Sequence, residues 1–334
     1  MTSNLPSLGS QLDSARAKLR RASQHLRALK QSLDRFGKGE PYRPGAKTYD
    51  PGVVGFLKSR EVIERITRTE LGIILPSPII RRRMFISEIP LTITITPAMD
   101  YSLQFLRWSI LIGEVVHNIG SALDNLIWEL AQPLPPAPPS TASSKTRSAY
   151  QTKLNSIGFP YTKQRSNWGQ SCTRYLALVP DAATRIVLEE FQAFYAWENE
   201  GTAPETFPLE IVHELWNRDK HRTVNLSLIG SSFQFTRVRM PNFFPGVDNL
   251  PSEIVELLPL RPIEGETEVA KLLVHFPHEI ELPNRRFVEV NVLVQPTFTL
   301  GILFGQGSPG EGLNALDRLR AAHKLATQVV DRFL

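Results

Sequence analysis

The sequence predicts an α+β protein: a mostly helical body, an antiparallel or mixed sheet in the C-terminal half, and a closing C-terminal helix. Three observations support this fold class. Apolar residues follow helical spacing at both ends of the chain and in much of its first 220 residues. After residue 222, short segments alternate apolar and polar residues between turn residues, which indicates strands. The 334 residues suffice for a large core, and the single cysteine, Cys172, excludes an internal disulfide framework.

Two amphipathic helices are predicted at the ends of the chain, over residues 10–36 and after residue 311. Each has a narrow apolar seam, which needs a partner helix. The simplest arrangement packs the two helices together, and a homodimer through these terminal helices is the alternative. The seams consist of Leu12, Ala15, Leu19, Ala22, Leu26, Leu29, Leu33 and Phe36 in the first helix and Leu316, Leu319, His323, Ala326, Val330 and Phe333 in the last.

The region between these helices divides by composition. A Pro/Gly-rich connector with a short helix near residues 56–70 precedes a strand over residues 85–96, where Pro90 indicates an edge or a bend. A helix over residues 99–131 follows, and the next helices are expected near 146–157, 167–178, 180–199 and 208–220. The predicted organisation is therefore an N-terminal helix (1–37), a connector (38–84), a helical core (85–225), a β-rich segment (226–310) and a C-terminal helix (311–334).

Charge is distributed unevenly along the chain. Residues 1–83 hold seventeen basic and seven acidic residues, whereas the remainder is acidic on balance, within a net charge of +5. A basic region of this kind either contacts nucleic acid or is a solvated helix face that docks on its own acidic body. No segment has the apolar length of a signal peptide or a membrane span, so we expect a cytoplasmic protein with no membrane partner.

The most informative segment is G-E-V-V-H-N-I-G-S-A-L-D-N-L-I-W-E-L, residues 113–130, within the predicted helix over 99–131. Short polar side chains form one ridge of an otherwise apolar helix. The ridge consists of Glu114, His117, Asn118, Ser121, Asp124 and Asn125. Gly113 and Gly120 lie seven residues apart and would let a second backbone approach the ridge closely.

Three interpretations of this ridge stay open, and the simplest is that its side chains are only exposed to solvent. A network of hydrogen bonds between helices would satisfy buried polar groups and fix the register of the helices. Alternatively, His117 and Asp124 are candidate catalytic residues that take part in ligand binding or proton transfer, and Asp124 and Asn118 orient partners. In this interpretation the ligand-binding candidates of the ridge are Asn118, Ser121 and Asn125.

A second polar cluster is W-N-R-D-K-H-R, residues 216–222, at the predicted end of a helix. Arg218, Lys220 and Arg222 suit a phosphate or another anion, and Asp219 is a further ligand-binding candidate. His221 is a candidate general acid or base because histidine titrates near neutral pH. The alternative is that these cations only stabilise the negative end of the helix dipole.

A metal site is a further alternative, although no cofactor is expected. Two Glu-x-x-His motifs, Glu114 with His117 and Glu210 with His213, match half of a helical di-metal carboxylate site. Single glutamates from two further helices would complete it, with Glu64 and either Glu189 or Glu190 in the expected order.

The segment 113–130, together with N-R-D-K-H-R, resembles a family of bacterial proteins of unassigned activity. Members of that family carry a G-D-x-x-H-N-L-R-S-A-L-D-H helix and a later D-K-H-R segment. Their helix is loosely similar to the signature helix of HEPN domains, which are helical RNases and toxins with an Arg, four to six residues, and a His. Gly120 and Asn125 stand at those two positions here. The chain is therefore either a relative without catalysis or one that uses His117 or His221 instead.

The leading hypothesis joins the two polar clusters. It expects a polar pocket for RNA, a nucleotide or another anionic ligand, formed by the ridge and the N-R-D-K-H-R segment, with HEPN-type cleavage doubtful because its His is missing. A structural or protein-interaction module without catalysis is the alternative.

Overall fold

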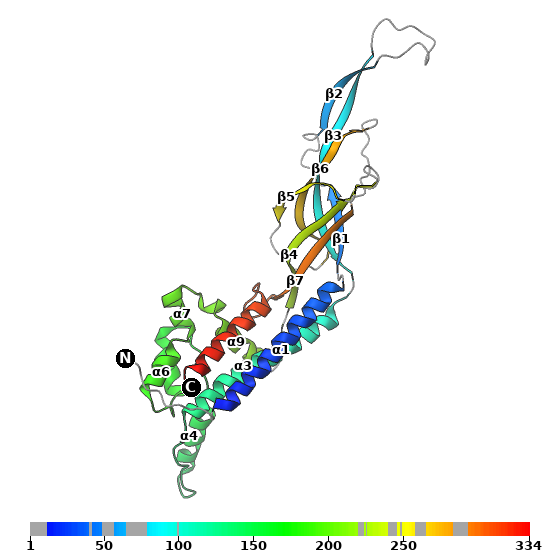
Figure 1. Cartoon of the computed structure of the whole chain (residues 1–334). Helices are drawn as coiled ribbons and strands as arrows, with labels where there is room; N and C mark the ends of the chain where they lie inside the picture. The colour runs from blue at the N-terminus through cyan, green and yellow to red at the C-terminus, as the bar shows by residue number, and fades with distance from the viewer. Residues whose placement is uncertain are drawn as a thin grey trace. The chain divides into compact units, whose positions relative to one another are not determined.

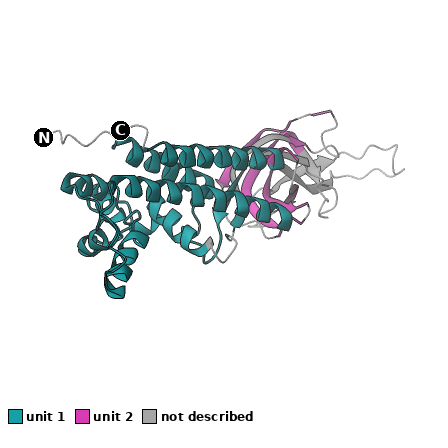
Figure 2. Ribbon diagram, turned by 90° about the horizontal axis from the view of Figure 1, so that it is seen from below, with its two compact units in different colours: residues 1–36, 101–228, 301–334 teal, residues 37–100, 229–300 magenta. Residues whose placement is uncertain are grey.

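The computed structural model describes residues 12–39, 42–48, 57–64, 79–98, 100–219, 224, 226–239, 246–247, 249–257, 265–282 and 293–334 (Figure 1). The chain forms two compact units (Figure 2). The first contains residues 1–36, 101–228 and 301–334, and the second contains residues 37–100 and 229–300. Helices dominate the first unit and strands the second, which confirms the predicted α+β class.

The helical unit is built around one long central helix, α3, over Ser102–Leu130. Its buried stripe includes Trp108, Ile112, Ile119, Leu123 and Leu126. The other helices described in this unit are α1 (Asp13–Lys38), α4 (Ser144–Asn155), α5 (Trp168–Tyr175), α6 (Ala182–Glu189), α7 (Ala193–Glu200), α8 (Pro208–Asp219) and α9 (Ala315–Asp331), with short 3-10 turns at η3 (Arg165–Asn167) and η4 (Pro204–Thr206).

The N-terminal helix α1 packs on α3 and α9, as Figure 1 shows. Trp108 of α3 donates to the hydroxyl of Ser32, and Asn125 of α3 donates to that of Ser14, so the two helices run antiparallel. His323 of α9 bonds to the carbonyl of Leu19 at 2.9 Å. The predicted packing of the terminal helices is thereby confirmed, because their apolar seams are buried within a single chain.

The second unit is organised by the long strand β3, over Ile79–Pro97. Strands β1 (Tyr42–Thr48) and β2 (Leu57–Glu64) pair antiparallel with it, and so does β6 (Thr267–Leu282), which in turn pairs with β5 (Ser252–Leu257). The strand order is β1-β3-β6-β5, with β2 also beside β3. Strands β4 (Leu226–Arg239) and β7 (Leu293–Phe304) form a separate pair and continue into the helical unit at Leu226–Leu228 and Gly301–Phe304.

Several sequence-based expectations for this region were wrong. The helix expected near residues 56–70 is the strand β2 where it is described, because pairing with β3 outweighs a weak local helical preference. The sheet also recruits strands from the first hundred residues, whereas the prediction placed it in the C-terminal half. The short strand β5 was missed, since its residues Ser252–Leu257 carry little apolar alternation.

Pro90 does not mark an edge strand, because β3 has neighbours on both sides. The residue lies where the described pairing with β2 ends at Ile86 and that with β1 begins at Leu91. On the side of β3 that pairs with β1 and β2, residue 90 has no described partner. The N–H that proline lacks therefore breaks no described ladder bond on that side, and a proline is tolerated there.

The helix expected over residues 180–199 is two helices, α6 and α7, because Gln192 adopts an extended backbone conformation between them. In the part of the chain that the structure describes, no helix combines the length and the apolar character that crossing a bilayer requires.

Candidate functional site

The helical unit contains an open hollow of about 690 Å³, here called the α8 hollow. Helices α3, α4, α5 and α8 contribute to its wall, and so does the segment 155–161. Its lining includes Asp124, Tyr161, His213, Trp216 and Asn217. Polar, ionisable and aromatic side chains thus meet in one concavity, which is the usual setting of a ligand site.

Helix α8 approaches α3 closely because Gly120 has no side chain. A Cβ at Gly120 would lie 2.6 Å from Cζ3 of Trp216, so the indole occupies the space that any larger residue would fill. The ring of His117 lies edge-on to the same indole, with centroids 6.3 Å apart. The prediction expected a second backbone at Gly120, but the group in contact is the side chain of Trp216.

Asp124 is the one ridge residue that lines the hollow. Its Oδ1 accepts a hydrogen bond from the backbone N–H of Phe159 at 2.9 Å. Gly158 lies against the same carboxylate, since a Cβ there would be 3.1 Å from Oδ1. The carboxylate therefore anchors the segment 158–159 to α3.

Tyr161 and His213 form a stacked pair in the wall of the hollow. Their rings are almost parallel, at 3°, and their centroids are 4.2 Å apart. The tyrosine hydroxyl is buried and has no hydrogen-bond partner among the residues that the structure describes. Burial raises the pKa of Tyr161 well above its ordinary value, and the negative charges of Asp124 and Glu210 add to the effect. The phenol is therefore neutral at every pH at which the protein is ordinarily studied.

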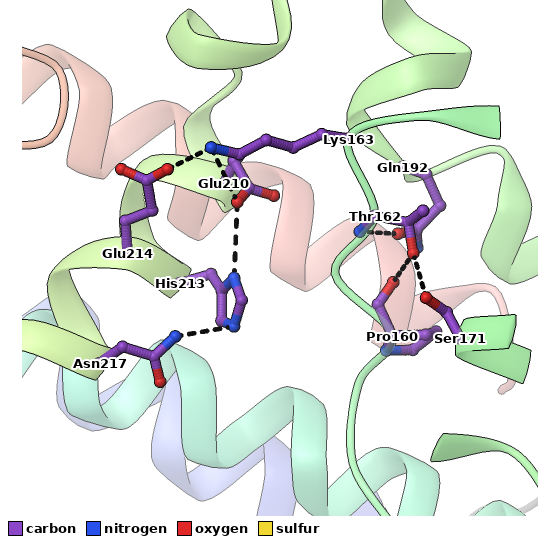
Figure 3. A network of polar contacts seen from close by, with 9 residues as sticks. All are labelled: Pro160, Thr162, Lys163, Ser171, Gln192, Glu210, His213, Glu214 and Asn217. Atoms are coloured by element: carbon purple, nitrogen blue, oxygen red, sulfur yellow. Dashed lines mark hydrogen bonds and ion pairs between the residues drawn. The ribbon is translucent and has the colours of Figure 1, made fainter. Parts of the chain in front are cut away.

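Helix α8 presents four polar side chains on one face, shown in Figure 3. Nδ1 of His213 lies 3.5 Å from Oε1 of Glu210 without hydrogen-bond geometry, and its Nε2 lies 2.9 Å from Nδ2 of Asn217. Glu210 is only 5% exposed, although it carries a carboxylate.

Lys163 balances the charge on this face. Its ammonium lies 3.5 Å from Glu210 and bonds to Glu214 (Figure 3). Burial lowers the pKa of Lys163, but the hydrogen bond to Glu214 and the charge of Glu210 outweigh it, so the pKa is raised overall. The lysine is thus a permanent cation beside the imidazole.

Buried hydrogen bonds hold the segment that carries Tyr161 and Lys163. The N–H of Thr162 donates to Oε1 of Gln192 at 3.0 Å, and the Thr162 hydroxyl bonds to that of Ser171 at 3.0 Å (Figure 3). Nε2 of Gln192 donates to the carbonyl of Leu188. These contacts fix the backbone directly after the stacked tyrosine.

Two cations stand at the rim of the α8 hollow. Lys153 lies in the last turn of α4 and Arg174 in the last turn of α5, and both side chains are exposed. Arg174 lies over the ring of Tyr175, 5.0 Å from its centroid. Among the described residues, no carboxylate forms an ion pair with Lys153 or Arg174.

Most of the predicted ridge lies elsewhere. Asn118 is buried and donates to the carbonyl of Glu114 in its own helix, while Asn125 bonds to α1. His117 is exposed, with its Nε2 3.5 Å from the hydroxyl of Ser121. Asn118 and Asn125 thus make structural contacts, and His117 is exposed to solvent. Asp124 both anchors the segment 158–159 and lines the hollow.

The second predicted cluster is only partly described. Arg218 donates to the carbonyl of Gly307, on the loop after β7, and does not line the α8 hollow. Asp219 is the last residue of α8. Lys220, His221 and Arg222 lie outside the described residues, so the predicted convergence of His221 with Asp124 stays a prediction.

The two Glu-x-x-His motifs have separate partners. Glu114 lies 3.9 Å from His25 of α1, whereas Glu210 faces Lys163 and His213. Glu189 and Glu190 pair with Arg165 and Arg332. Within the described ranges, no three His, Cys, Asp or Glu side chains gather as metal ligands.

Sequence reasoning missed Tyr161, Lys163 and the rim cations, and it included Trp216 and Asn217 in the second polar cluster without giving either of them a role. One signal could have located the polar face of α8: Glu210, His213, Glu214 and Asn217 follow the helical spacing of positions i, i+3, i+4 and i+7. No comparable pattern marks Tyr161, because its role depends on the fold.

Comparison of the chain with models of protein families, with curated proteins and with solved structures found no match. The resemblance to the bacterial family and to HEPN domains is therefore still a prediction.

Proposed function

We propose that the helical unit binds a nucleotide, either free or within single-stranded RNA, in the α8 hollow. The observation that carries this proposal is the composition of the lining: the exposed cations Lys153 and Arg174 share one hollow with a partly buried carboxylate and imidazole and an exposed amide. A nucleotide has the matching groups, since its phosphate is anionic and its sugar and base offer hydrogen-bond donors and acceptors.

The rim cations suit the phosphate. Lys153 and Arg174 are exposed, and a phosphate binds such side chains through charge-assisted hydrogen bonds. Arg174 already lies over Tyr175, which holds the guanidinium at the edge of the hollow.

The interior suits the sugar and the base. Asp124 and Asn217 are hydrogen-bonding groups of the lining, and Trp216 and Tyr175 supply aromatic surface. Proteins that bind single-stranded RNA combine a basic groove with aromatic side chains on which bases stack. A volume of about 690 Å³ also lies within the range of small-molecule pockets.

The proposal is tested by titrating the full-length protein with AMP and with a single-stranded RNA hexamer at low salt. The double variant Lys153→Ala/Arg174→Ala should bind at least about tenfold more weakly, because it loses two phosphate contacts. The matched control Arg20→Ala/Arg21→Ala removes two exposed cations from α1 and should change affinity by less than about twofold.

Two results would overturn the proposal. One is no binding of either probe by folded protein, which would favour the structural or interaction module. The other is an equal loss in both double variants, which would assign RNA binding to the basic surface as a whole. AMP and the hexamer separate a free nucleotide from an RNA ligand.

A further inference from the structure

We infer that the α8 hollow takes up a proton on His213 when it binds an anionic ligand. The inference rests on the proposed function and adds to it a regulation by pH. It follows from the balance of charge around the imidazole and from the contacts of the ring.

The fixed charges of the site cancel. Among the described residues that line the hollow or bond to the polar face of α8, the acidic ones are Asp124, Glu210 and Glu214, and the basic ones are Lys153, Lys163 and Arg174. With a neutral imidazole these groups sum to no net charge, whereas a protonated His213 makes the site positive. The sign of the site therefore depends on one histidine.

The surroundings of His213 accommodate a positive charge. Its Nδ1 faces the carboxylate of Glu210 at 3.5 Å, and its ring lies flat against that of Tyr161 at 4.2 Å. A cation over an aromatic face is attracted by the ring quadrupole. Near neutral pH, Tyr161 is neutral because its pKa is raised, and the raised pKa of Lys163 keeps the lysine charged.

The side-chain amide of Asn217 can form a hydrogen bond with either protonation state of the His213 ring. Its amide lies 2.9 Å from Nε2 of His213. A neutral ring accepts from the amide N–H, and a protonated ring donates to the amide oxygen after the amide turns over. Gain of the proton therefore costs no hydrogen bond at this position.

The first experiment measures affinity against pH by calorimetry on the full-length protein. The probe is a uridylate hexamer without terminal phosphates, because phosphodiesters keep a constant charge between pH 5.5 and 8. Affinity of the wild-type protein should fall about tenfold over this range, a typical coupling between linked sites. The affinity of His213→Gln should change less than about twofold over this range. The control His278→Gln, at an exposed position of β6, should keep the wild-type dependence.

A second measurement needs no variant and so does not depend on the folding of His213→Gln. Binding enthalpies of the wild-type protein at pH 7, in buffers of different ionisation enthalpy, give the number of protons taken up. We expect the protein to take up a fraction of a proton for each ligand bound, with one proton per ligand as the upper limit. Binding that is independent of pH, without proton uptake, or a retained pH dependence in folded His213→Gln, would overturn this inference alone. Absence of binding at pH 5.5 would overturn the proposed function as well.

Discussion

The polar faces of α3 and α8 follow the same helical spacing but have different surroundings. On α3, Asn125 bonds to α1, Glu114 lies beside His25 of α1, and Asn118 bonds within its own helix. On α8, Glu210, His213 and Asn217 interact with one another and with the loop that carries Tyr161 and Lys163. A second helix covers much of the first face, whereas the second borders a hollow. The role of a polar stripe is thus decided by the element that covers it.

The contact that brings the two faces together gives the largest expected effect. Gly120→Ala should destabilise the protein by about 2 kcal/mol, although alanine favours helices, because the new methyl group overlaps the ring of Trp216. Urea denaturation measures the free energy of unfolding.

Gly169→Ala is the matched control for this substitution. Gly169 also lies in a helix, but nothing lies within 4 Å of a Cβ built there. The control should be neutral or about 0.5 kcal/mol more stable. A Gly120→Ala variant as stable as this control would show that α8 does not dock on α3 through Trp216.

The ion pairs beside the α8 hollow should matter more than those on exposed helix faces. Lys163→Met leaves the buried carboxylate of Glu210 without its cation and should cost about 1–2 kcal/mol at pH 7. The control Lys30→Met breaks an exposed pair with Asp34 within α1 and should cost less than about 0.5 kcal/mol.

The same pair has a defined pH dependence. Because the pKa of Lys163 is raised in the folded protein, its stabilisation is complete below the ordinary pKa of lysine. It is lost as pH rises through the folded value. Chemical denaturation of wild type and Lys163→Met should therefore converge only at strongly alkaline pH, and a difference that vanishes near neutrality would contradict the assignment.

The buried hydroxyl of Tyr161 should contribute nothing to stability. Tyr161→Phe should be neutral or up to about 1 kcal/mol more stable, since it removes a polar group that lacks a partner. Tyr150→Phe is the control, because that hydroxyl donates to the carbonyl of Pro135, and its loss should cost up to about 1 kcal/mol. A clear loss of stability in Tyr161→Phe would mean that the hydroxyl has an acceptor.

Tyr161 also affects how the free energy of unfolding changes at alkaline pH. Its pKa is raised in the folded protein, so the unfolded chain releases the phenolic proton first and stability falls as pH rises above about 10. Tyr161→Phe should have a shallower fall than wild type in denaturation between neutral and alkaline pH.

The smallest effect is expected on the α3 face. Glu114→Gln weakens a contact of 3.9 Å with His25 between partly exposed side chains, and it should change the free energy of unfolding by less than about 0.5 kcal/mol. Thermal unfolding at low and high salt measures this change. A loss comparable to that of Lys163→Met would remove the distinction between the two helix faces.

Some of this architecture was predictable because it depends on local periodicity. The helices α1, α3 and α9 and the strand after Pro90 follow from the spacing of their apolar residues. The strand β2 was not predictable in this way, because its backbone is fixed by partners some twenty residues away in β3. Asp124 was found from its place on a polar ridge, but most of that ridge has another role.

The sequence by itself determined the α+β class, the seams of the terminal helices and the small residue at Gly120 that admits a second element. These features depend on residues a few positions apart, whose relative directions are set by helix and strand geometry. Only the tertiary structure decided that His213 stacks on Tyr161 and that Lys163 faces Glu210. Those pairs join segments about fifty residues apart, and burial and charge balance at such a site exist only once the chain has folded.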